Sequence, residues 1–100
     1  MQNGTMKTVS DRLRRLRKLL GFETQQAMAA WIGVENSRYS NFERGFPLSH
    51  QAAVKICQKV PGMTLDWLYF GNAAGMPLEL ARRIGEAPGA DGGASRVSRA

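Results

Sequence analysis

A glycine that interrupts an apolar helical pattern constrains the fold of this chain more than any other feature. The segment TQQAMAAWIGVENSRYSNFERG (24–45) has a helix-favouring stretch, then Gly33, then a second stretch with helical spacing. Two short helices joined by a tight turn cross steeply, at roughly 90–120°. The crossing needs a small contact residue, here Ala29, and a turn residue that accepts positive φ, here Gly33. The side chains expected inside the crossing are Met28, Ile32, Val34, Tyr39 and Phe42.

Capping residues and apolar spacing predict a compact all-α domain over residues 9–71. The five expected helices cover residues 10–20, 25–32, 36–44, about 50–60 and 65–70. Four of them have a hydroxyl residue as their expected N-cap: Ser10, Thr24, Ser49 and Thr64. Leu, Ala, Arg and Gln are common, whereas Val and Thr are sparse, and this balance favours helix over sheet.

The two ends of the sequence differ from this domain in composition. Residues 1–8 are mostly polar and are expected to form a flexible arm. Residues 72–86 are expected to form a loop followed by one or two helical turns over 78–86. Residues 87–100 are rich in Gly, Ala and Ser. They are expected to form a flexible, disordered C-terminal tail, because they bury too little surface to offset the entropy of ordering.

Basic residues are concentrated near the start of the sequence. The chain has a net charge of +6, and residues 1–20 contain six basic residues against one acidic residue. Residues 21–70 are neutral, and residues 71–100 add one positive charge. Such a cluster suits a polyanion, with nucleic acid first and an anionic membrane second, or an ordinary solvated helix face. The membrane alternative is weak, because the leucines of residues 13–20 are needed in the core.

Motifs for catalysis and for metal or cofactor binding are missing from the sequence. It contains one histidine, His50, and one cysteine, Cys57, and it has no Gly-rich phosphate loop, Cys/His ligand set or nucleophile motif. An enzyme, a metal site and a cofactor are therefore not expected. A single cysteine excludes an internal disulfide. No stretch approaches the ~20 apolar residues of a membrane span, and no signal-peptide pattern opens the chain, so a cytoplasmic protein is expected.

Residues 12–71 resemble the Cro/repressor-type helix-turn-helix domain, also called the XRE family. The resemblance rests on RLRRLRKLLG, the 24–45 segment, LSHQAAVKICQKV and TLDWLYFG. Within 24–45, the family's characteristic positions are filled by Gln25, Ala29, Gly33 and the Glu-x-Gly of 43–45. The resemblance implies a lambda-repressor-like five-helix bundle. It also implies a homodimeric regulator, usually a repressor, that reads a short palindromic site in double-stranded DNA.

The resemblance also implies a role for each polar residue around the third helix. Base contacts are implied for Asn36, Ser37, Arg38 and Asn41. Asparagine can bond adenine N6 and N7 as a pair, and serine can donate or accept. Phosphate contacts are implied for Gln25, Ser40 and Arg44. The family's partly buried ion pair, which joins the first helix to the end of the third, falls on Arg17 and Glu43. An exposed polar helix face is the alternative interpretation of the polar residues.

Glu35 departs from the family pattern, which often has a small hydroxyl residue at this lead-in to the third helix. A carboxylate there repels a phosphate backbone. Trp31 and Tyr39 are also larger than the residues common at their positions. These departures favour an alternative function, in which the same fold is a protein-interaction module, an antiactivator or antitoxin, that holds a protein partner.

Overall fold

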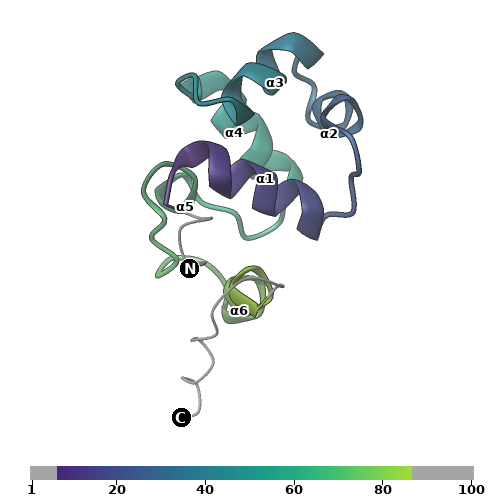
Figure 1. The fold of residues 1–100 in the computed structure, drawn as a ribbon. Coiled ribbons are helices and arrows are strands. Elements are labelled where there is room, and N and C mark those ends of the chain that lie inside the picture. Colours follow the sequence, from purple (N-terminus) through teal and green to yellow (C-terminus); the bar gives the residue numbers. More distant parts are fainter. Residues whose placement is uncertain (1–6, 87–100) are drawn as a thin grey trace.

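The chain folds into six short helices over residues 7–86, the part that the computed structural model describes. Figure 1 shows α1 (Val9–Leu19), α2 (Gln25–Ile32), α3 (Asn36–Glu43), α4 (His50–Lys59), α5 (Leu65–Phe70) and α6 (Leu78–Glu86). Residues 7–86 contain no strand, so the predicted all-α class is confirmed. The predicted tail over 87–100 lies outside the described residues, as does the predicted arm apart from residues 7 and 8.

Local hydrogen-bond chemistry sets where most of the helices begin. Three expected caps are present: Thr24 accepts from the N–H of Ala27, Ser49 from that of Ala52 and Thr64 from that of Trp67. The prediction for α1 was wrong: its N-cap is Thr8, two residues before Ser10, and accepts from the N–H of Asp11, so the helix begins and ends one residue earlier than predicted. Ser10 therefore lies inside the helix. α3 begins after Glu35 without a side-chain cap and ends at Glu43, one residue before the predicted end.

A short turn that begins at Gly33 joins α2 to α3. Gly33 ends α2 with φ of 94° and donates its N–H to the carbonyl of Ala29, which is 1% exposed. Tyr39 and Phe42 of α3 are buried in the core, while Val34 in the turn is partly buried. The largest fully buried side chains come from all of the first five helices: Tyr39, Leu13, Leu16, Met28, Ile56 and Leu68.

α6 is a correction to the five-helix arrangement. The helix occupies the predicted range, 78–86, but its nine residues make more than the one or two turns expected, and it packs on α1. Ile84 is 2% exposed, and its carbonyl accepts a hydrogen bond of 3.1 Å from Nε of Arg15. Leu80 and Ala81 are partly buried against the same core. The contact with α1 stabilises this helix. Because the partner residue lies on α1, the sequence of 78–86 alone does not reveal the contact.

Candidate functional site

The outward face of α3 carries the short polar side chains that the sequence predicted as a binding surface. Asn36, Ser37 and Arg38 are exposed, and Ser40 and Asn41 are half-buried. Residues three and four apart lie on the same side of a helix, so Asn41 is a neighbour of both Ser37 and Arg38. Three of the four predicted base-contact residues, Ser37, Arg38 and Asn41, therefore share one face of α3, and Asn36 lies at the start of the helix. Figure 1 shows α3 at the end of the molecule opposite α6.

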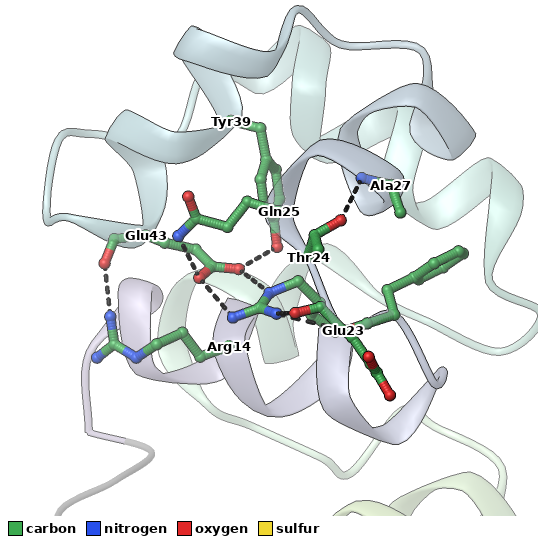
Figure 2. Close-up of polar contacts among 9 residues, drawn as sticks. Arg14, Glu23, Thr24, Gln25, Ala27, Tyr39 and Glu43 are labelled. Atoms are coloured by element: carbon green, nitrogen blue, oxygen red, sulfur yellow. Dashed lines mark hydrogen bonds and ion pairs between the residues drawn. The ribbon is translucent and has the colours of Figure 1, made fainter.

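A buried carboxylate holds the inner side of α3. Glu43 is 2% exposed and forms an ion pair with Arg17, whose Nε lies 2.8 Å from Oε2 and whose Nη2 lies 3.2 Å from Oε1. The hydroxyl of Tyr39 donates to Oε2 at 2.5 Å, and Nε2 of Gln25 donates to Oε1 at 3.0 Å (Figure 2). One carboxylate thus connects α1, α2 and α3 beneath the polar face.

The surroundings of Glu43 keep it ionised. Burial alone raises the pKa of a carboxyl group, but the hydrogen bonds from Arg17, Tyr39 and Gln25 outweigh it, and the pKa of Glu43 is lowered. The same bond to Glu43 raises the pKa of Arg17. Burial, followed by the bond to the carboxylate, raises the pKa of the Tyr39 hydroxyl. The network therefore has a fixed protonation pattern, with a charged pair and a neutral phenol.

Gln25 lies at the start of α2, where the resemblance implied a phosphate contact. Its amide nitrogen instead donates inward to Glu43, and the side chain is half-buried. One amide hydrogen is used by this bond, and a second one is left for another acceptor. The partner of Gln25 inside the protein was not anticipated from the sequence.

Besides Arg38 on the polar face, two cationic side chains lie near the ends of α3, Lys55 at the turn before it and Arg44 after it. Lys55 donates to the carbonyl of Gly33 in the α2–α3 turn at 3.0 Å, and Arg38 lies 3.4 Å from the hydroxyl of Ser49. Arg44 follows the end of α3 and donates to Oδ1 of Asn41 at 3.1 Å. The carboxylate of Glu35 is exposed at the other end of the helix. The rim of the face is thus mainly positive, with one negative group at the lead-in.

The arginines of α1 contact backbone carbonyls of other segments. Arg12 donates to the carbonyls of Leu68 and Tyr69, Arg14 to that of Glu43, Arg15 to that of Ile84, and Arg17 to those of Phe22 and Glu23. Three of these arginines reach the last turn of another helix, where carbonyls have no partner within the helix. Much of the basic cluster therefore attaches α1 to α3, α5 and α6, a role that the sequence interpretation missed.

The lowered pKa of Glu43 predicts that acid weakens the fold. A glutamate in the unfolded chain has a pKa of about 4.3, so the folded chain binds fewer protons than the unfolded chain around that pH. The stabilisation from Glu43 is full above that value and is lost as the pH falls through the lower folded pKa. We expect urea unfolding between pH 5 and pH 3 to show a steeper loss of stability in the wild type than in Glu43→Gln. Equal slopes in the two proteins would contradict this linkage.

Comparisons of the chain with models of known protein families, with curated proteins and with solved structures gave no match. Over residues 7–86, His, Cys, Asp and Glu nowhere form a group of three or more that suits a metal ion. Within the same range, no helix has both the length and the apolar character needed to cross a membrane. The polar face of α3 and the buried network that holds it are the features of residues 7–86 that suggest a function.

Proposed function

We propose that this chain is a sequence-specific regulator of the lambda-repressor-like helix-turn-helix type, an XRE-family repressor that binds double-stranded DNA through α3. The observation that carries the proposal is the polar face formed by exposed Ser37 and Arg38 and half-buried Asn41, with exposed Asn36 at the start of the same helix. A buried ion pair holds this helix from behind. Short amide and hydroxyl groups of this kind are the side chains that hydrogen-bond to base edges.

The width of a single α-helix such as α3 is compatible with docking in the major groove of duplex DNA. That groove is about 12 Å wide and admits a single helix. Lys55 lies beside the turn before α3 and Arg44 follows the end of α3, so these two cations are placed to approach phosphates near the ends of a bound helix. Contacts of this type add affinity that falls with salt concentration and is largely independent of sequence. In the proposed complex, the α3 face supplies specificity and the cations supply much of the affinity.

The proposed regulator acts as a homodimer. A two-fold dimer places two copies of α3 about 34 Å apart, which is one turn of duplex, and it reads a palindromic site. A bound site with two inverted half-sites at that spacing would support this arrangement. Selection of bound fragments from the source genome, followed by sequencing, identifies the DNA site to be used in binding titrations.

Asn41→Ala is expected to weaken binding to the selected site by about 1–3 kcal/mol, because the amide contributes base contacts there. Binding to unrelated duplex should hardly change, because that affinity comes from phosphate contacts. Fluorescence anisotropy titrations on both duplexes measure the two effects. Gln58→Ala, which removes an exposed amide from α4, is the matched control and should leave both affinities unchanged. Equal losses on every duplex would show that Asn41 does not read bases.

A protein partner is the second candidate ligand for the same face of α3. Two observations favour it: the exposed carboxylate of Glu35 beside the face, and the use of the α1 arginines inside the molecule. In this alternative the chain is an antiactivator or antitoxin. Duplex retention at low salt, lost as salt is raised, supports the DNA-binding proposal. Tight capture of a purified partner together with no duplex retention at low salt supports the alternative.

A further inference from the structure

Asn41 and Arg44 form a hydrogen-bonded pair at the end of the polar face. Nη1 of Arg44 lies 3.1 Å from Oδ1 of Asn41. A guanidinium group has five N–H donors and no acceptor, so the amide oxygen of Asn41, and not its nitrogen, must face Arg44. The guanidinium also lies over the ring of Phe46, 5.7 Å from its centre. Phe46 thus helps to hold the guanidinium of Arg44 in place, and the hydrogen bond from Arg44 sets the orientation of the Asn41 amide.

This orientation changes what Asn41 offers to a base. Paired recognition of adenine requires the amide oxygen to accept from N6 while the amide nitrogen donates to N7. The oxygen of Asn41 is already bonded to a cation. Its second lone pair lies beside that positive charge, which opposes the approach of the electropositive amino group of adenine. The outward group is then the NH₂ of Asn41, next to the remaining N–H groups of Arg44.

Guanine matches this set of donors better than adenine does. Its major-groove edge presents two acceptors, N7 and O6, whereas the adenine edge presents one acceptor and one donor. We propose that Asn41 and Arg44 act as a single donor-only unit that selects guanine over adenine. Arg44 is the positioning residue that sets the preference of Asn41. This inference rests on the proposed DNA-binding function, and it reverses the adenine contact expected for Asn41 from the sequence.

The test is selection from a random duplex library, followed by titrations in which single bases are exchanged. For the wild type, one guanine in each half-site should be replaceable by adenine only with about a tenfold loss of affinity. Replacement by 7-deazaguanine, which lacks the N7 acceptor, should also weaken binding. Asn41→Ala should abolish the preference at this position, and that loss identifies the base that Asn41 reads.

Two variants of Arg44 separate positioning from simple charge. Arg44→Lys keeps a group that only donates, so the guanine preference should remain. Arg44→Gln introduces a carbonyl that accepts and an amide that donates. Because Asn41 and residue 44 then no longer discriminate between the two bases, Arg44→Gln should bind the guanine and adenine duplexes with affinities within about twofold of each other. Arg44 is exposed, so an unchanged unfolding midpoint by circular dichroism confirms that Arg44→Gln is folded.

The possible failures are distinguishable. If the wild type binds duplex but prefers adenine at the Asn41 position, or if Arg44→Gln keeps the guanine preference, the inference is wrong and the proposed function stands. If the wild type retains no duplex even at low salt, the proposed function is wrong and the inference fails with it.

Discussion

Glu43→Ala is expected to lower the free energy of unfolding by about 3–5 kcal/mol, because it leaves the charge of Arg17 buried without its partner. The side chains of Glu43 and Arg17 are 1% and 11% exposed, so little water is present to replace the lost carboxylate. Tyr39 and Gln25 lose their acceptor in the same step. A small domain has a total stability of about 5–15 kcal/mol, so a large part of it depends on this carboxylate.

Urea unfolding followed by circular dichroism measures the effect, and the chain contains a matched control. Glu79 pairs with Arg82 on the surface of α6, with side chains 67% and 52% exposed. Glu79→Ala should therefore cost less than about 1 kcal/mol. The double variant Arg17→Met/Glu43→Leu should recover much of the loss, since no charge is then stranded. A cost for Glu43→Ala as small as that for Glu79→Ala would show that Glu43 does not join the three helices.

The helix boundaries were largely predictable because their causes are local. α2 and α5 have the bounds expected from the sequence, since each begins with a threonine cap and is closed by a glycine, Gly33 and Gly71, with positive φ. The start of α1 was harder to predict, because two neighbouring hydroxyl residues can each act as its N-cap. Thr8 and Ser10 are both hydroxyl residues, and their oxygens lie 3.0 Å apart, but only the hydroxyl of Thr8 accepts from the N–H of Asp11.

The partners of the charged residues were less predictable because they lie on other helices. The sequence shows that Arg12 and Arg15 are basic, but their acceptors are backbone carbonyls 56 and 69 residues away. No pattern of side chains marks a carbonyl as an acceptor. The bond from Tyr39 to Glu43 is different, because the two residues are four apart on α3. That spacing places side chains together on a helix, so this contact was within reach of sequence reasoning.

Gly62→Ala is expected to destabilise the fold by about 2–5 kcal/mol through two separate effects. Gly62 has φ of 88°, a left-handed conformation that an alanine adopts at a cost of about 1–2 kcal/mol. An added Cβ would also lie 2.8 Å from both Cγ and Cδ of Pro77, and 3.3 Å from Leu80. The proline ring is rigid, so the segment that leads into α6 must shift, with an overpacking cost of about 1–3 kcal/mol.

Gly21→Ala separates the two effects, because Gly21 has φ of 90° and an added Cβ there meets nothing within 4 Å. It should show only the conformational cost of about 1–2 kcal/mol in urea unfolding. In a Pro77→Ala background the ring atoms are gone and only the 3.3 Å contact with Leu80 remains, so the cost of Gly62→Ala should fall towards that of Gly21→Ala. The difference between the two glycine variants thus measures how tightly the start of α6 packs against the turn after α4. If that difference is zero in the wild-type background, α6 does not depend on this contact, and its attachment rests on α1 through Arg15 and Ile84.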